Sequence, residues 1–183
     1  MDEQLEFVKS IASRLDSAGI PYMMTGSMAM AIYSVPRMTR DIDLVVEVKP
    51  VDVDKIVSLF SKDCYIDRDS VREAVDAHST FNIIHNEWVV KADFIIRKDQ
   101  EYRREEFARR QKVVIEGMTI FVVSVEDLIL SKLVWGKKSQ SDLQFRDVRQ
   151  MISTVSELDW EYMKKWAVFL GIDALLEKAR KNG

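Results

Sequence analysis

Three aspartates are the residues of this sequence whose type and position most clearly suggest chemistry. Asp41 and Asp43 stand one residue apart in an otherwise apolar segment, and Asp93 interrupts the apolar stretch 88–96. Aspartate is depleted in strands, and a buried carboxylate is costly unless it is paired or bound to a metal. Two carboxylates on one face of a strand, roughly 7 Å apart at their bases, repel each other unless a cation lies between them. Oxygen ligands on a rigid strand suit a hard cation such as Mg²⁺.

A Gly-Ser pair precedes the first two aspartates. Gly26 and Ser27 follow the apolar segment 22–25 and open a helical segment that runs to Tyr33. Glycine lets the backbone approach a ligand closely, and the free amides at a helix start favour phosphate oxygens. Taken alone, this pair is better explained as a helix cap after a tight turn. A solvated strand end would likewise explain an isolated Asp-x-Asp, and a salt bridge would explain Asp93.

The elements that must position these residues follow from hydrophobic periodicity. Ile42, Leu44 and Val46 alternate with the aspartates and are expected to face the core. Helices are predicted over residues 3–18, 27–33, 51–60, 70–77 and 101–110, and strands over 22–25, 41–48, around 65, 80–84, 88–96, 113–115 and 118–123. This mixture predicts an α/β (α+β) protein with a mixed sheet flanked by helices.

The pattern becomes purely helical after residue 123. Ser124 and Asp127 resemble an N-terminal capping pair at the start of a helix that reaches about Lys137. Further helices are predicted over 143–154, 159–169 and 172–181. We therefore expect an α/β core over residues 1–123 with a helical C-terminal part over 124–183 packed on it, the alternative being one single domain. Trp135, Trp160 and Trp166 are expected to pack this helical part.

The composition of the chain excludes several classes of protein. The chain has 183 residues, and its single cysteine, Cys64, excludes an intramolecular disulfide and a cysteine-based zinc site. No segment approaches the roughly 20 apolar residues that cross a bilayer, and the acidic N-terminus does not fit a secretory signal. A cytoplasmic protein without a membrane partner is therefore expected. The net charge of −3 means that any contact with nucleic acid is local, or that the partner is a nucleotide. The basic run 97–112 alternates with glutamates, which is typical of a solvated helix with internal ion pairs.

The combined pattern resembles the DNA polymerase β-like nucleotidyltransferase superfamily. Its signature is an apolar residue, Gly, Gly or Ser, a spacer of about a dozen residues, and Asp-apolar-Asp/Glu-apolar. Here Gly26-Ser27 and Asp41-Ile42-Asp43-Leu44 are separated by thirteen residues, and only Thr25 departs from the signature. The segments 37–44 and 124–133, with Arg146-Asp147 downstream, are similar to the bacterial minimal nucleotidyltransferase and abortive-infection (AbiEii-like) branch. The resemblance covers about residues 22–151.

The resemblance implies roles for the acidic residues and the Gly-Ser turn. Asp41 and Asp43 would bind two Mg²⁺ ions together with a nucleoside triphosphate such as ATP. Asp93 would complete the metal site or act as the base for the acceptor hydroxyl. Gly26 and Ser27 would hold the β- and γ-phosphates.

Basic residues are the remaining candidates for binding the nucleotide. Lys132 would contact phosphate or pair with Asp147, although a lysine stem covering the core explains its position as well. Arg40 would pair with the aspartates or reach a phosphate, and Arg37 is a weaker candidate.

The function implied is transfer of a nucleoside monophosphate from an NTP to a hydroxyl, with release of pyrophosphate. The acceptor could be an RNA end, a protein side chain or a small molecule, and the branch suggests a cognate toxin or antitoxin partner. A catalytically silent antitoxin or binding module of the same fold is the principal alternative. A metal-dependent phosphohydrolase is a third, less favoured because the chain has only two histidines.

Overall fold

A computed structural model describes residues 3–36, 39 and 41–181 of the chain. The strands are β1 (Tyr22–Thr25), β2 (Asp41–Val46), β3 (Cys64–Tyr65), β4 (Thr80–His85), β5 (Lys91–Ile96), β6 (Gln111–Ile115) and β7 (Met118–Val122). The helices are α1 (Glu3–Ala18), α2 (Gly26–Tyr33), the short 3-10 helix η1 (Pro50–Asp52), α3 (Val53–Phe60), α4 (Arg68–Ala77), α5 (Glu101–Ala108), α6 (Val125–Ser139), α7 (Asp142–Thr154), α8 (Trp160–Leu170) and α9 (Asp173–Lys181). The mixed α/β architecture expected from the sequence is confirmed.

The strands form one mixed seven-stranded sheet in the order β3-β4-β5-β2-β1-β7-β6. β2 runs parallel to β5 and antiparallel to β1, so the strands that carry the aspartates are neighbours at the centre of the sheet. Thr25 pairs with Asp43, and Asp43 pairs with Asp93. The register therefore places these three residues in one row across β1, β2 and β5.

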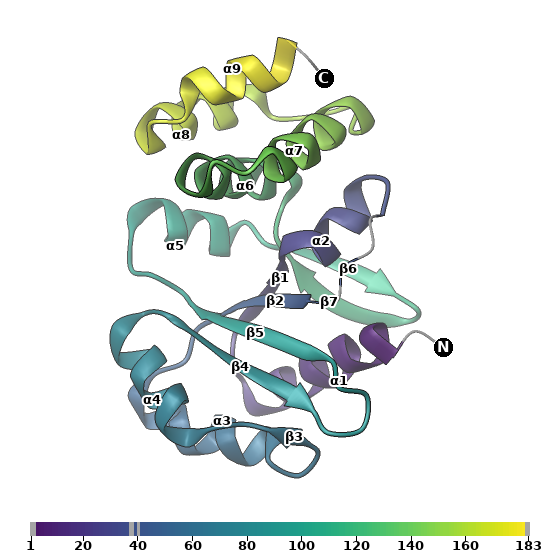
Figure 1. The fold of residues 1–183 in the computed structure, drawn as a ribbon, viewed down its shortest axis with the longest axis vertical. Coiled ribbons are helices and arrows are strands. Elements are labelled where there is room, and N and C mark those ends of the chain that lie inside the picture. Colours follow the sequence, from purple (N-terminus) through teal and green to yellow (C-terminus); the bar gives the residue numbers. More distant parts are fainter. Residues whose placement is uncertain (1–2, 37–38, 40, 182–183) are drawn as a thin grey trace.

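Helices lie on both sides of this sheet (Figure 1). α1, α3 and α4 lie on one side, and the C-terminal helices α6 to α9 lie together beyond the other. Ile42, Leu44 and Val46 are buried, as their alternation predicted. One face of β2 thus packs in the core, which leaves the face bearing Asp41 and Asp43 directed away from it.

A buried polar network holds α6 in place. The Ser124 side chain accepts a hydrogen bond from the Asp127 amide, as the capping pattern predicted. The fully buried Asp127 carboxylate accepts hydrogen bonds from the Tyr162 hydroxyl at 2.6 Å, the Ser124 hydroxyl at 2.7 Å and Arg109 Nε at 3.2 Å. These contacts connect the start of α6 with α8 and with the residue that follows α5. The buried Tyr102 hydroxyl also donates to Asp127 Oδ1, at 3.2 Å. Breaking these contacts would leave hydrogen-bonding capacity of a buried carboxylate unsatisfied, so the position of α6 is strongly specified.

Several boundaries differ from the sequence-based prediction. The strand predicted from residue 88 begins only at Lys91, because Val89 adopts a left-handed conformation (φ +53°) and the Trp88 ring stacks on His85 at 4.0 Å. The strand predicted to reach residue 48 ends at Val46, although Val48 remains buried. Among the described residues, no helix is long and apolar enough to cross a membrane.

Candidate active site

The turn between β1 and α2 packs directly against the Asp43 carboxylate. Gly26 has a left-handed backbone (φ +68°), and a Cβ atom there would lie 2.0 Å from Asp43 Oδ2 and 2.9 Å from Asp43 Cβ. No side chain fits in that space, and L-residues disfavour that conformation. Glycine is therefore required at position 26 for two separate reasons, and the first helical amides of α2 lie beside a carboxylate.

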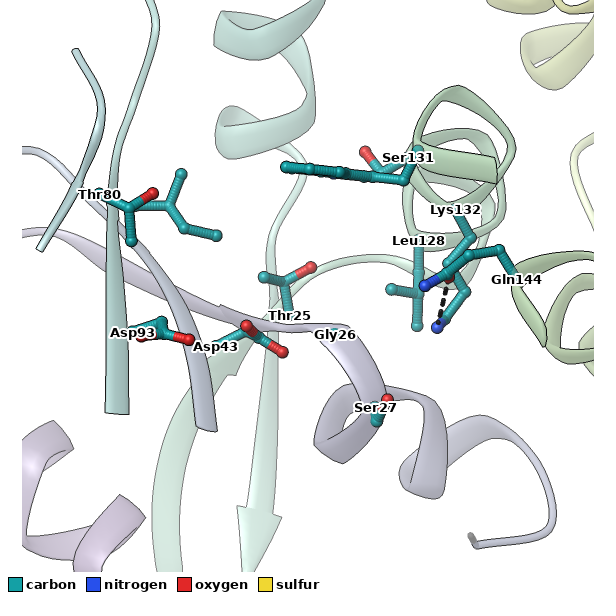
Figure 2. Close-up of a pocket in the computed structure, with 12 residues that line it drawn as sticks. Thr25, Gly26, Ser27, Asp43, Thr80, Asp93, Leu128, Ser131, Lys132 and Gln144 are labelled. Carbon is teal, nitrogen blue, oxygen red and sulfur yellow. Dashed lines mark hydrogen bonds between the residues drawn. The ribbon is translucent and has the colours of Figure 1, made fainter. Parts of the chain in front are cut away.

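A cavity of about 290 Å³ opens between the sheet and α6, with this turn in its wall (Figure 2). Asp43 and Asp93 lie next to each other on the sheet side, and Lys132 and Gln144 lie on the helical side. The other lining residues are Thr25, Gly26, Ser27, Thr80, Ile95, Leu128, Ser131 and Trp135. The tertiary structure thus brings together residues from β1, α2, β2, β4 and β5 and residues from α6 and α7.

The surroundings of Asp43 disfavour the negative charge of its carboxylate. Burial raises the pKa of Asp43, and the neighbouring carboxylates of Asp93 and Asp41 raise it further. The cationic side chains of Lys132 and Lys91 act in the opposite direction. A site that disfavours the charge of its own carboxylate attracts a compensating cation.

Lys91 supplies such a cation and was not identified from the sequence. Its Nζ lies 2.9 Å from Asp93 Oδ2 and 3.7 Å from Asp41 Oδ1, and the hydrogen bond to Asp93 raises the pKa of the lysine. Lys91 stands two residues before Asp93 on β5, so the same alternation that picked out the aspartates places it on their face.

The predicted metal ligands are only partly gathered. Asp43 and Asp93 face the same cavity, whereas the Asp41 side chain is 61% exposed and does not line it. Over the described ranges, no three acidic, histidine or cysteine side chains converge closely enough to hold one metal ion. The Asp43–Asp93 pair nevertheless fits a hard cation, because both ligands are carboxylates on adjacent rigid strands and both line one cavity.

Lys132 has the charge pair that the sequence offered as one alternative. Its Nζ lies 2.7 Å from Asp147 Oδ2 and 3.2 Å from Gln144 Oε1, and the side chains of the ion pair are 6% and 3% exposed. Lys132 also lines the cavity, so the amine lies where it could face a ligand. Ser27 is buried at the start of α2 and lines the same cavity. Arg40 and Arg37 lie outside the described residues.

One face of α6 forms the wall opposite the aspartates. Leu128, Ser131, Lys132 and Trp135 follow helical spacing along this face. The expectation that Trp135 packs the C-terminal helices is wrong, since the side chain is 58% exposed and lines the cavity. Ser131, Gln144 and Thr80 were also missed, because the sequence carries no signal of which helix covers the sheet.

Three solved structures have folds similar to that of this chain. A nucleotidyltransferase-like antigenic protein from Paracoccidioides brasiliensis is 18% identical, with 99% of this chain and 94% of that chain covered and a TM-score of 0.60. ANT(2″)-Ia in complex with adenylyl-2″-tobramycin is 14% identical, with 92% and 97% covered and a TM-score of 0.60. The lincomycin-bound lincosamide antibiotic adenylyltransferase LnuA is 11% identical, with 85% and 98% covered and a TM-score of 0.55. At these identities the likeness establishes the fold.

Family membership comes from the sequence itself. No curated protein sequence matches this chain significantly. The model of one protein family, by contrast, matches residues 1–177, which is nearly the whole chain. The chain therefore belongs to the family described as nucleotidyltransferases of unknown function (DUF6036), and it is a nucleotidyltransferase by family and by fold.

Proposed function

We propose that this protein transfers a nucleoside monophosphate from an NTP to a hydroxyl acceptor in a Mg²⁺-dependent reaction. The observation that carries the proposal is the placement of the Gly26-Ser27 turn against the Asp43–Asp93 pair in one cavity. A phosphate-binding helix start beside two carboxylates is what nucleotidyl transfer needs, since catalysis there is mainly positioning and charge neutralisation. ATP is the first donor to test, because two of the structural neighbours carry adenylyl transfer in their names.

The Gly-Ser turn and the aspartates have distinct tasks in the proposed reaction. The Gly26 and Ser27 amides orient the β- and γ-phosphates at the start of α2. Asp43 and Asp93, joined by the exposed Asp41 from the start of β2, would hold Mg²⁺, which supplies charge neutralisation at the phosphates when bound. Asp93 also accepts the proton of the acceptor hydroxyl. The hydroxyl oxygen then bonds to the α-phosphorus as the bond to the β-phosphate bridging oxygen breaks and pyrophosphate leaves.

The two lysines act at opposite sides of this cavity. Lys132, oriented by its ion pair with Asp147, presents a positive charge to the phosphates. Lys91 compensates the aspartates and holds the Asp93 carboxylate at 2.9 Å. It must yield that contact when a metal ion and substrate enter.

A catalytically silent binding module is the second candidate, and the Lys91 contact is the observation that favours it. An ammonium group bridging Asp93 and Asp41 stabilises the acidic cluster without any metal ion. The proposal of a toxin–antitoxin context rests on the sequence resemblance alone and applies to both candidates.

The decisive experiment measures the transfer of a radioactive label from the NTP donor to an acceptor. The purified protein is incubated with each α-³²P-labelled NTP, MgCl₂ and total RNA or cell extract, beside Asp43→Asn and Asp93→Asn variants. Asp54→Asn serves as the control, because Asp54 is exposed and pairs with Arg68 away from the cavity. Transfer that depends on Mg²⁺ and is lost only in the first two variants supports the enzyme. Transfer that survives in both of them rules out the proposed site, and Mg²⁺-independent binding without transfer favours the silent module.

A further inference from the structure

A second cavity of about 300 Å³ adjoins the first along the sheet. The two share Thr25, Ile95, Ser131 and Trp135 in their walls. The second cavity extends past them to the end of β5, the start of the segment before α5, and the last turns of α6. It contains neither Gly26 nor any of the three aspartates, so it is a separate subsite of one continuous cleft.

The strand register shows on which side of Asp43 this subsite lies. Asp43 pairs with Thr25 across β1 and β2, and the Gly26-Ser27 turn continues from Thr25 toward the Asp41 end of β2. The second cavity is lined by Val45 and Ile95, which lie on the other side of the Asp43–Asp93 row. In an in-line displacement the attacking oxygen and the leaving pyrophosphate stand on opposite sides of the phosphorus. With pyrophosphate held at Gly26-Ser27, the attacking hydroxyl enters from the side of the second cavity.

The charge of the second cavity is predominantly positive. Its cationic lining residues are Arg97, Lys98, Arg103 and Lys138, and its only carboxylate is Glu106. Glu106 is buried and is already engaged by Arg103 at 2.7 Å and by the Ser131 hydroxyl. Arg97 is likewise paired, with Glu47 and Asp99, so the positive charge open to a ligand is that of two lysines. Lys98 and Lys138 are exposed and form no ion pair with any described residue. This lining favours an anionic ligand and disfavours a polyamine.

A flat apolar surface stands at the junction of the two cavities. Trp135 is 58% exposed although the turn of α6 before it, Ser131 to Leu133, is buried. An indole held at the wall of a cationic cleft is a stacking platform for an aromatic ring. Positive charge and a stacking surface together select a ligand that carries both a phosphate and a base.

We propose that the second cavity binds the acceptor and that the acceptor is a nucleotide unit, either a free nucleotide or the 3′ end of an RNA strand. This inference rests on the proposed function. A ribose hydroxyl oxygen of the acceptor bonds to the α-phosphorus of the NTP, the bond to the pyrophosphate oxygen breaks, and the hydroxyl proton passes to Asp93. Trp135 stacks on the acceptor base, while Lys98 and Lys138 contact its phosphates.

The test compares two charge reversals of equal size. Lys98→Glu/Lys138→Glu changes the second cavity, and Lys62→Glu/Lys164→Glu changes exposed lysines elsewhere. The binding probes are a short 5′-fluorescein-labelled single-stranded RNA, followed by anisotropy, and ATP, followed by calorimetry. Unlabelled CMP is the competitor that distinguishes a free nucleotide from an RNA end, and thermal melting checks that each variant is folded.

Lys98→Glu/Lys138→Glu is expected to bind RNA at least about tenfold more weakly, with unchanged ATP affinity. The slope of log affinity against log salt concentration should fall by the equivalent of about two phosphate contacts. Trp135→Ala is expected to lose about tenfold as well, without a change in the salt slope. Displacement of the RNA by CMP identifies a free-nucleotide subsite, and failure of CMP to displace it identifies an RNA end.

Two results would overturn the inference. One is equal weakening of RNA binding in both charge-reversal variants, and the other is a loss confined to ATP affinity, which would assign the cavity to the donor base. Failure of the proposed function gives a different result, because RNA binding would then keep its dependence on Lys98, Lys138 and Trp135 while no variant transfers label.

Discussion

Replacing Gly26 by alanine tests the close contact on which the site depends. An L-residue in the left-handed conformation (φ +68°) costs about 1–2 kcal/mol. The new methyl group would lie 2.0 Å from Asp43 Oδ2, and rotation of the carboxylate alone cannot relieve the 2.9 Å contact with Asp43 Cβ. β2 must therefore shift, and such overpacking adds about 1–3 kcal/mol. The free energy of unfolding should fall by about 2–5 kcal/mol in total.

Gly19→Ala is a matched control for the backbone contribution. Gly19 has nearly the same left-handed conformation (φ +66°), and a Cβ atom there would meet no atom within 4 Å. This variant should lose only about 1–2 kcal/mol, as measured by urea unfolding, and its rate of nucleotidyl transfer should not change. The difference in stability between the two alanine variants then measures the contact with Asp43.

The rate of nucleotidyl transfer is the second measurement on the Gly26→Ala and Gly19→Ala variants. Displacing a reacting group by about 1 Å can cost about 100-fold in rate, so Gly26→Ala should transfer label at most at about 1% of the wild-type rate. Equal destabilisation of the two alanine variants, together with wild-type activity in Gly26→Ala, would refute the packing of the turn against Asp43.

Three further predictions concern charge. Asp43→Asn should abolish transfer yet stabilise the protein by about 0.5–2 kcal/mol at neutral pH, because burial and the neighbouring carboxylates raise the pKa of Asp43. In urea unfolding this gain should shrink as the pH falls, since the wild-type carboxyl then takes up a proton. Lys132→Met should lower the free energy of unfolding by about 1.5–3 kcal/mol, because the buried charged hydrogen bond between Lys132 and Asp147 is lost. Lys132→Met/Asp147→Asn should recover part of that stability without recovering ATP affinity in calorimetry. The Arg14 guanidinium lowers the pKa of Asp63 to about 2, so the stability that this ion pair contributes should be complete above about pH 4 and disappear toward pH 2. The melting temperature of an Asp63→Asn variant should therefore fall less steeply than that of the wild type between about pH 4 and pH 2, and an equal fall would contradict this prediction.

Much of the fold and part of the candidate site could be predicted from local patterns. The alternation of Ile42, Leu44 and Val46 with the aspartates gave the buried face of β2, and the Ser124–Asp127 pair located the start of α6. Both features depend on residues a few positions apart, which is the range over which strand and helix periodicity act. The boundary at Lys91 was missed because a left-handed Val89 and the stacking of Trp88 on His85 are set by tertiary packing.

By itself, the sequence determined which residues carry charge, that a Gly-Ser turn precedes the second helix, and the order of helices and strands. Only the tertiary structure decided that Asp93 would stand beside Asp43, that Lys91 would bridge Asp93 and Asp41, and that Trp135 would face the cleft. The reason is physical: these contacts depend on residues far apart in the chain, and their geometry is set by strand register and by the way α6 packs on α2, α7 and α8. Hydrophobic periodicity reports which side of an element is buried, but it carries no information about which element lies opposite.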